Sequence, residues 1–334
     1  MSKLKSIYIL NTDAYDVIYG ADERADLANL LDIYAPQQTV QSVTEHPEIL
    51  KPVEVIISGW GAPCMDAGFL DSAPDLKLVL YGAGSIRGIV TDEFWDRGNL
   101  INSAYGANAI PVAHYTLSQI LFCLKHGWQF AHAVKRLHGY PMQQEFMGPG
   151  AYRSTVGIIS LGMVGRMVCQ LLAPFQLRIV AYDPYVTPDT AQSLGVELVA
   201  LGDVFRQADV VSLHTPWLKE TEGMITGKHF QQMKQGASFI NTSRGAVVSE
   251  DEMIGVLAQR PDLFAVLDVT HPEPPAPDSA LYTLENVVVT PHIAGSMGRE
   301  CNRMGRYMVE DLQRYLRGEP LMWGITREMA KVLA

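Results

Sequence analysis

Three polar residues that could carry out chemistry follow strand-like apolar runs in the second half of the chain. They are Arg244, Glu273 and His292. A guanidinium can hold a carboxylate through two parallel hydrogen bonds, and an imidazole beside a carboxylate is favoured in its protonated form. Reduction of a 2-oxo acid uses these groups, because it requires a cation for the carboxylate, a donor to the carbonyl oxygen and a proton source. The three residues are therefore our candidate catalytic residues.

Each candidate also has a simpler explanation. The guanidinium could form a surface ion pair, the imidazole could form a loop hydrogen bond, and the carboxylate could be solvated before a Pro-rich turn. Three other histidines are rival proton donors: His114 lies in an apolar helix-like stretch, His214 follows a cofactor-side strand, and His271 shortly precedes the candidate glutamate. The joint placement of the three candidates downstream of a dinucleotide-type turn favours the catalytic interpretation.

The turn that follows the strand-like run beginning at residue 156 matches a dinucleotide-binding fingerprint in part. Gly162 and Gly165 take the second and third positions of G-x-G-x-x-G, where glycine lets backbone amides approach a pyrophosphate and lets a helix pack on a strand. Ser160 takes the first position, and this departure could loosen cofactor binding. Asp183 ends the next run and could accept hydrogen bonds from the adenosine ribose, which favours NAD over NADP, or could instead cap a helix.

These residues are positioned by two series of short apolar runs separated by helix-like stretches. The first series comprises 6–10, 53–58, 76–81 and 100–103, and the second comprises 156–160, 178–183, 210–214, 237–242, 264–268 and 286–290. Near-continuous apolar strands between helices predict an α/β protein with two doubly wound parallel sheets. A Gly- and Pro-rich connector at 139–150 separates the series, and a helical pattern after Gly298 is expected to return to the first domain.

Composition limits the kinds of partner. The 334 residues are 48% hydrophobic and 19% charged, which is enough for two domain-sized cores. The formal net charge of -10 disfavours nucleic acids and anionic membranes, which bind clustered Lys and Arg. The four cysteines are far apart without a C-x-x-C pair, so neither a zinc site nor a disulfide framework is expected, and we expect no metal.

The most apolar stretch, 112–124, is too short to cross a bilayer. We expect a buried helix there, with Asn108 as its cap and Pro111 in its first turn. The N-terminus lacks the pattern of a secretory signal, so a cytoplasmic location is expected.

Several of these motifs resemble the D-isomer-specific 2-hydroxyacid dehydrogenases, the family of phosphoglycerate, glycerate, D-lactate and hydroxypyruvate enzymes. The resemblance extends from about Val53 to Leu316 and rests on the motifs at 81–85, 102–108, 156–165, 240–246, 267–269 and 290–295. It implies an NAD-dependent oxidoreductase that interconverts a small 2-oxo acid and the D-2-hydroxy acid by hydride transfer. It also implies that a Rossmann NAD-binding domain, residues 105–297, is inserted into a flavodoxin-like substrate domain, residues 1–104 and 298–334.

The resemblance assigns roles to single residues. Arg244 would bind the substrate carboxylate and carbonyl, His292 would be the acid/base, and Glu273 would be its partner. Substrate binding is also expected at the loop whose amides would face the carboxylate, Gly82, Ala83 and Gly84. It is expected at Tyr81 as well, although core packing is the alternative role for that side chain. NAD would be bound by the following residues: Gly162, Met163, Val164, Gly165, Asp183, Thr215, Thr221, Thr242, Ser243, Asp268, Ala294 and Gly295.

The resemblance further implies a homodimer joined through the cofactor domain and its long helix, near 109–126. Because about forty residues follow His292, no C-terminal regulatory domain is expected. Two departures from the family pattern are Ser160 in place of glycine and Thr270-His271 where many members have Phe and an acidic residue.

Two other functions stay open at this point. One is formate or phosphite oxidation on the same fold: formate enzymes pair the histidine with an amide, which Glu273 argues against, whereas phosphite enzymes keep Arg, Glu and His. The other is an NAD-sensing binding module similar to the corepressors that share this fold, although the acidic charge counts against it.

Overall fold

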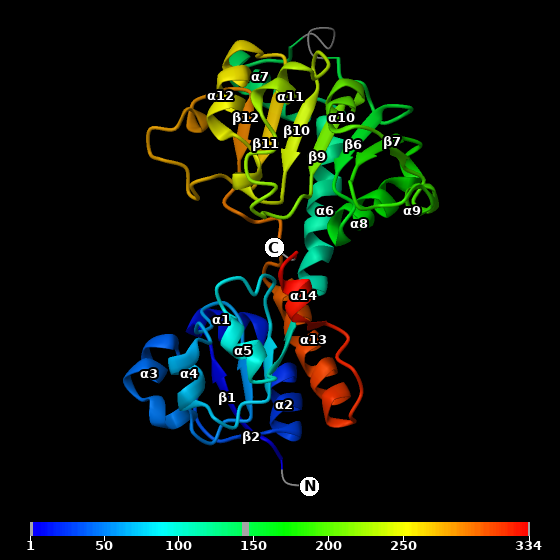
Figure 1. The fold of residues 1–334 in the computed structure, drawn as a ribbon. Helices are drawn as coiled ribbons and strands as arrows, with labels where there is room; N and C mark the ends of the chain where they lie inside the picture. Colours follow the sequence, from blue (N-terminus) through cyan, green and yellow to red (C-terminus); the bar gives the residue numbers. More distant parts are fainter. Residues whose placement is uncertain (1–2, 142–146, 333–334) are drawn as a thin grey trace. The chain divides into compact units, whose positions relative to one another are not determined.

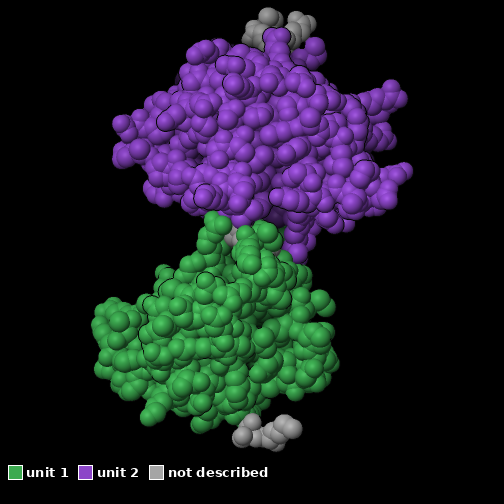
Figure 2. Space-filling view, in the orientation of Figure 1, with its two compact units in different colours: residues 1–109, 296–334 green, residues 110–295 purple. Residues whose placement is uncertain are grey.

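The computed structural model describes residues 3–141 and 147–332. The chain forms two compact units, one built on a parallel sheet and the other on a sheet that is parallel except for one edge strand. Unit 1 comprises residues 1–109 and 296–334, and unit 2 comprises residues 110–295 (Figure 2). Each of the ten predicted apolar runs contains a strand, so the α/β prediction is confirmed.

Unit 2 contains a seven-stranded sheet whose strands all run parallel (Figure 1). Its strands are β6 (Thr155–Ile159), β7 (Arg178–Tyr182), β8 (Glu197–Leu198), β9 (Val210–Leu213), β10 (Ser238–Asn241), β11 (Phe264–Leu267) and β12 (Val287–Val289). The spatial order is β12-β11-β10-β9-β6-β7-β8. The chain therefore runs outward from β6 to β8 and then returns to β9 on the other side of β6. This is the Rossmann order, and it confirms the predicted fold of this part.

Helices cover both faces of the unit 2 sheet. They are α6 (Tyr105–Cys123), which begins in unit 1, and α7 (Gly127–Leu137), α8 (Met163–Leu172), α9 (Pro188–Ser193), α10 (Leu201–Gln207), α11 (Gly227–Gln231) and α12 (Glu250–Gln259). Successive strand residues point to opposite faces, so Phe239 packs in one apolar cluster with Phe205 while Ile240 packs in the other with Val168. Burial on both faces explains why these strands read as continuous apolar runs.

Unit 1 contains a six-stranded sheet in the order β13-β5-β4-β3-β1-β2. Its strands are β1 (Lys5–Ile9), β2 (Asp32–Ile33), β3 (Val55–Ser58), β4 (Leu78–Tyr81), β5 (Leu100–Ser103) and β13 (Gly324–Ile325). The order of β2, β1, β3, β4 and β5 is flavodoxin-like, as predicted, and β13 adds an antiparallel edge.

The helices of unit 1 come from both ends of the chain. They are α1 (Thr12–Ile18), α2 (Ala21–Leu30), α3 (Val40–Glu45), α4 (Ala67–Ser72), α5 (Asp92–Asp96), α13 (Arg299–Leu316) and α14 (Arg327–Ala330). Met304 and Met308 of α13 pack in the same apolar cluster as Tyr8 and Ile57. The expectation that the C-terminal helix returns to the first domain is thus confirmed.

The start of α6 differs from the prediction. The helix begins at Tyr105, so Asn108 lies inside it and is not its cap, and Pro111 lies beyond its first turn. The Asn108 side chain instead accepts a hydrogen bond from the Ser296 amide at 2.8 Å. Proline removes one helical hydrogen bond, yet the buried apolar positions on either side of it keep the helix continuous. A tertiary contact, which the sequence pattern does not contain, replaces the predicted cap.

The described residues also bear on the predicted absences. None of the helices they form combines the length and apolar character needed to span a bilayer. Within residues 3–141 and 147–332, no three His, Cys, Asp or Glu side chains gather where they could hold a metal ion. The four cysteines are free, and burial raises the pKa of the Cys123 and Cys169 thiols to about 12, so both stay protonated at neutral pH.

Candidate active site

His292 and Glu273 form a direct pair at the carboxyl edge of the unit 2 sheet. Nδ1 of His292 lies 2.7 Å from Oε1 of Glu273. The two side chains remain 45% and 43% exposed, so the pair is open to a ligand. Because Nδ1 is bonded to the carboxylate, Nε2 is the ring nitrogen left to exchange a proton with a ligand.

The loop that carries His292 is shaped by Asp268. This carboxylate is 1% exposed, and it accepts hydrogen bonds from the Thr290 hydroxyl at 2.6 Å and from the amides of Ile293 and Ala294 at 2.9 Å each. The backbone carbonyl of Asp268 accepts from the His292 amide at 3.0 Å. These bonds hold His292 at φ +53°, a left-handed conformation that a residue with a side chain rarely adopts.

Arg244 follows β10, the strand beside β11. Its Nη1 donates to the Ser243 carbonyl at 2.7 Å, and its own carbonyl accepts from the Asn241 side chain at 3.1 Å. These bonds bind the arginine loop to the end of its strand. The guanidinium is only partly buried, and its five donors can serve a carboxylate as well as the local carbonyl.

The loops that carry the three candidates follow neighbouring strands. Arg244 follows β10, Glu273 follows β11 and His292 follows β12. The Asp268 amide donates to the Asn241 carbonyl at 2.9 Å, and a Cβ at Gly245 would lie 2.0 Å from the carbonyl carbon of Thr270. The backbone after β10 therefore lies directly against the backbone after β11, and glycine at 245 allows this approach.

The rival histidines are less suited to proton transfer. Burial lowers the pKa of His214 to about 4, so its imidazole is neutral at neutral pH, and its Nε2 lies 3.0 Å from the Ser212 hydroxyl. His114 is exposed on α6. The ring of His271 packs edge-on against Trp217, with centroids 5.4 Å apart. None of these has a carboxylate partner like that of His292.

The dinucleotide turn joins β6 to α8. Gly162 precedes the helix and has no side chain to cap it, and no atom lies within 4 Å of a Cβ placed there. Met163 and Val164 form the first turn, whose amides have no intrahelical partner. Uncapped amides beside open space at a helix N-terminus are suited to a pyrophosphate.

Gly165 is required for close packing, so we expect Gly165→Ala to destabilise the protein. The new Cβ would lie 2.2 Å from the Ser160 carbonyl oxygen, a backbone atom. Overpacking of this kind costs about 1–3 kcal/mol, and the free energy of unfolding measured by denaturant titration should fall by that amount. Gly162→Ala is the matched control and should stay within about 0.5 kcal/mol of wild type, because its site is open. Equal free energies of unfolding for the two variants would contradict the close packing of Gly165 against the Ser160 carbonyl.

Asp183 ties the end of β7 to the dinucleotide turn. Its Oδ2 accepts from the Leu161 amide and its Oδ1 from the Tyr185 amide, each at 2.8 Å. The next helix, α9, is capped by Thr187, so Asp183 is not a helix cap. Each carboxylate oxygen keeps an unused lone pair, which leaves Asp183 able to accept from ribose hydroxyls.

The other residues expected to bind the cofactor follow the ends of β9, β10 and β12. The Thr215 and Thr242 side chains are buried, and the Thr242 hydroxyl lies 3.0 Å from that of Thr116 on α6. The Ser243 hydroxyl donates to the Thr215 carbonyl. Ala294 is buried, and Gly295 is the last residue of unit 2.

Thr221 has a local structural role in the loop after β9. Its hydroxyl donates to the Pro216 carbonyl at 2.6 Å and accepts from the Leu218 amide at 2.8 Å. Both bonds close a turn within the loop. The Thr221 hydroxyl is therefore hydrogen-bonded to backbone groups of its own loop.

The end of β4 and the loop after it, in unit 1, contain the residues expected to bind the substrate. Tyr81 is 5% exposed and packs in an apolar cluster with Val79, and burial raises its pKa to about 12. Its side chain therefore belongs to the core. The Gly82 amide already donates to the Ser58 carbonyl at 2.8 Å. Ala83 and Gly84 therefore remain as the amides that could face a carboxylate.

Two supporting residues carry no signal in the sequence. The Tyr115 hydroxyl lies 3.1 Å from that of Thr290, and a Glu250 carboxylate oxygen accepts from the His271 amide at 3.0 Å. Burial raises the pKa of Glu250 above its usual range. Both residues act on the loops that hold the histidine and its partner, but each reads in the sequence as an ordinary helix residue.

Comparison with known families links unit 2 to a cofactor. A family model described as "D-isomer specific 2-hydroxyacid dehydrogenase, NAD binding domain" matches residues 117–294, which lie within unit 2. The unit therefore contains an NAD-binding domain, and the open, uncapped start of α8 fits the pyrophosphate of that cofactor.

Comparisons of the chain with individual known proteins agree with the family-model match. The chain is 32% identical to a D-3-phosphoglycerate dehydrogenase of Archaeoglobus fulgidus over 77% of this chain and 48% of that protein. It is 30% identical to a glyoxylate reductase of Korarchaeum cryptofilum over 85% of this chain and 86% of that protein. A crystal structure of D-lactate dehydrogenase from Aquifex aeolicus with NAD and lactic acid has a TM-score of 0.72 and 25% identity, covering 94% and 96% of the two chains. The chain spans about half the length of the phosphoglycerate dehydrogenases it matches.

Proposed function

Because this chain belongs to the D-isomer-specific 2-hydroxyacid dehydrogenase family, we propose that it interconverts a small 2-oxo acid and the corresponding D-2-hydroxy acid with NAD. The observation that carries the proposal is the half-exposed pair in which Nδ1 of His292 lies 2.7 Å from Oε1 of Glu273. The two residues follow the neighbouring strands β12 and β11. We assign NAD binding to the domain at residues 105–297 and substrate binding to the domain at residues 1–104 and 298–334.

The proposed reaction divides the work among three side chains. When bound, NADH supplies the hydride that C2 of the 2-oxo acid receives. Arg244 holds the substrate carboxylate through its planar fork. Nε2 of His292 gives a proton to the carbonyl oxygen as C2 is reduced, and takes it back in the oxidation direction. Glu273 orients the ring through Nδ1.

The other predicted site residues are assigned by the same proposal. The amides of Met163 and Val164 with Gly162 and Gly165 receive the pyrophosphate, and Asp183 receives the ribose. The nicotinamide half is assigned to the residues that follow β9 to β12: Thr215, Thr221, Thr242, Ser243, Asp268, Ala294 and Gly295. The amides of Ala83 and Gly84 are assigned to the substrate carboxylate.

A substrate panel tests the proposal. NADH consumption should be followed by absorbance with glyoxylate, hydroxypyruvate, pyruvate, 2-ketoisocaproate and phenylpyruvate, each over a range of pH. We expect turnover of at least one of these acids. Tight NADH binding without turnover of any acid would overturn the proposal and favour an NAD-sensing module, whereas NAD reduction by phosphite or formate alone would favour those reactions.

Glu273→Gln should lower kcat for reduction. The amide keeps the size of the side chain but removes the negative charge that faces Nδ1 of His292 at 2.7 Å, so the ring loses the carboxylate that orients it for proton transfer. Steady-state kinetics on the best 2-oxo acid would measure the loss. Glu285→Gln is the control, because Glu285 is exposed and pairs with Arg136. A kcat equal to that of the wild type in Glu273→Gln would argue that another group orients His292.

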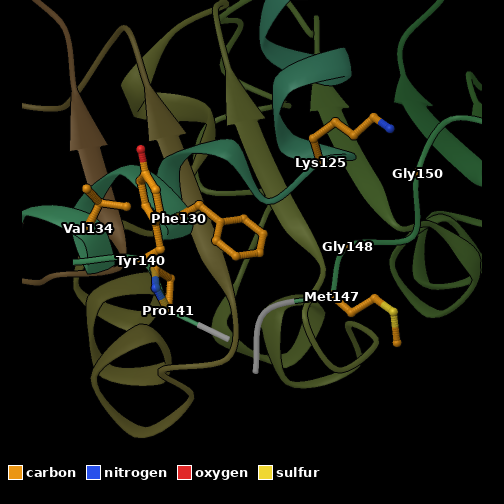
Figure 3. Close-up of a pocket in the computed structure, with 8 residues that line it drawn as sticks. All are labelled: Lys125, Phe130, Val134, Tyr140, Pro141, Met147, Gly148 and Gly150. Atoms are coloured by element: carbon orange, nitrogen blue, oxygen red, sulfur yellow. The ribbon is translucent and has the colours of Figure 1, made fainter. Parts of the chain in front are cut away.

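We further propose a homodimer formed through unit 2. A pocket of about 470 Å³ lies between the end of α6, α7 and the connector before β6, and is lined by Phe130, Val134, Tyr140 and Met147 among others (Figure 3). Tyr140 is 95% exposed and Met147 is 76% exposed. Large apolar side chains gathered on a surface are typical of protein interfaces, and a second copy of this segment supplies matching ones.

Sedimentation analysis tests the dimer. We expect twice the chain mass of 36.9 kDa for the wild type and a shift toward monomer for Tyr140→Glu, which places a charge in the contact. A wild-type monomer at micromolar concentration would overturn the proposed homodimer.

We also propose a cytoplasmic location. The free thiols of the chain are typical of a reducing compartment, which supports this location.

A further inference from the structure

Ser160 occupies a conformation that normally belongs to glycine. It lies between β6 and Gly162 at φ +74°, in the left-handed region. This is the first position of the dinucleotide fingerprint, where glycine has no such restriction. A serine held in this conformation is strained, so the hydroxyl that glycine lacks is the feature to examine.

The Ser160 hydroxyl forms a hydrogen bond between the loops that follow two neighbouring strands of the unit 2 sheet, β6 and β9. Its Oγ lies 2.8 Å from Oγ1 of Thr215, which follows β9 and is 3% exposed. β6 and β9 are neighbours at the point where the order of strand connection reverses. Ligands of open α/β sheets bind beyond the strand ends at this reversal. The two hydroxyls therefore join the loops on either side of the expected cofactor position.

Two further hydrogen bonds lead from Thr215 to the loop that carries Arg244. The Thr215 carbonyl accepts from the Ser243 hydroxyl, and the Ser243 carbonyl accepts from Nη1 of Arg244 at 2.7 Å. A single line of hydrogen bonds thus connects the loops that follow β6, β9 and β10. With glycine at position 160, this line would begin at Thr215 and would not reach the dinucleotide turn.

We propose that Ser160 is a cofactor-positioning residue, whose hydroxyl bond to Thr215 fixes the two loops that receive NAD. The serine then offsets the strain of its backbone by holding the turn in its binding arrangement, and it does not loosen cofactor binding as the departure from glycine suggests. This inference rests on NAD binding by unit 2 and is independent of the reaction proposed above.

NADH titration followed by fluorescence tests the role of the bridge. Ser160→Ala, Ser160→Gly and Thr215→Val each remove the hydroxyl pair, and each should weaken NADH binding by about 3- to 10-fold, the effect of one hydrogen bond. The double variant Ser160→Ala/Thr215→Val should bind no more weakly than the weaker single variant, because both changes remove the same bond. Thr215→Ser, which keeps the hydroxyl, should recover most of the affinity lost in Thr215→Val.

A matched control separates positioning from stability. The Ser154 hydroxyl donates to the Gly150 carbonyl at 2.6 Å just before β6, away from the strand ends that receive the cofactor. Ser154→Ala should lower the melting temperature without changing the Kd for NADH. Ser160→Gly should melt at or above Ser160→Ala, since glycine accepts φ +74° freely.

Two results would overturn the proposal. One is a Ser160→Gly variant that binds NADH as tightly as the wild type or more tightly, which would make the hydroxyl dispensable. The other is additive loss in the double variant, which would mean that the two hydroxyls act separately. Ser160→Gly and Thr215→Val decide the question even if Ser160→Ala fails to fold, and the binding measurement does not require turnover.

Discussion

Replacement of His292 by alanine is expected to lower kcat for reduction of the best 2-oxo acid by about 10²- to 10⁴-fold, the usual contribution of a positioned acid. Nδ1 of His292 lies 2.7 Å from the Glu273 carboxylate, which leaves Nε2 to carry the proton. Removal of the imidazole takes away the proton source but leaves the start of α8 intact. Steady-state kinetics should therefore show the loss in kcat, while NADH titration should show a nearly unchanged Kd.

His271→Ala is the control for this prediction. His271 is the rival that lies closest in sequence to Glu273, and its ring packs on Trp217. We expect its replacement to change kcat by no more than a small factor. A large loss in His271→Ala together with a small loss in His292→Ala would reverse the assignment of the proton donor.

Replacement of Arg244 by lysine is expected to lower kcat/KM by about 10²-fold, because the loss of one or two charge-assisted hydrogen bonds costs on the order of 1.5–3 kcal/mol each. Lysine keeps the positive charge but lacks the planar fork that binds a carboxylate in two places. In this protein the guanidinium also donates to the Ser243 carbonyl at 2.7 Å. A lysine ammonium cannot keep that bond and reproduce the fork, so the substrate carboxylate should lose its orientation.

Arg178→Lys serves as the control for the arginine prediction. Arg178 begins β7 and pairs with Glu197 on an exposed edge, so its replacement by lysine should leave kcat/KM unchanged. Kinetics on the best substrate of the panel would measure both variants. An unchanged kcat/KM in Arg244→Lys would show that the carboxylate is bound by another group.

Much of the fold could be predicted because burial leaves a clear pattern. The sheet of unit 2 is covered on both faces, and each of its longer strands therefore reads as a continuous apolar run ended by a polar residue. The two-residue strands β2, β8 and β13 were not predicted, because two residues are too few to form a pattern. The start of α6 was misplaced because Pro111 and Asn108 suggested a boundary that packing overrides.

The candidate site could be predicted as a set of residues but not as a set of contacts. Arg244, Glu273 and His292 were identified because strand ends in an open α/β sheet share one edge. The direction of a side chain was harder to infer: Tyr81 ends a strand like the others, yet it points into the core with Val79. The partners of Asp268 are three groups that lie 22 to 26 residues further along the chain, and sequence spacing contains no signal for them.

The split composition of unit 1 has a consequence for synthesis of the protein. Residues 1–109 emerge first, but the helix that covers one face of their sheet, α13, and the edge strand β13 come from residues beyond 295. All of unit 2 is translated in between, as one continuous segment. Until then the apolar cluster of the first segment lacks Met304 and Met308 of α13 and is only partly covered, and this interval is when chaperone binding or aggregation would act on the chain.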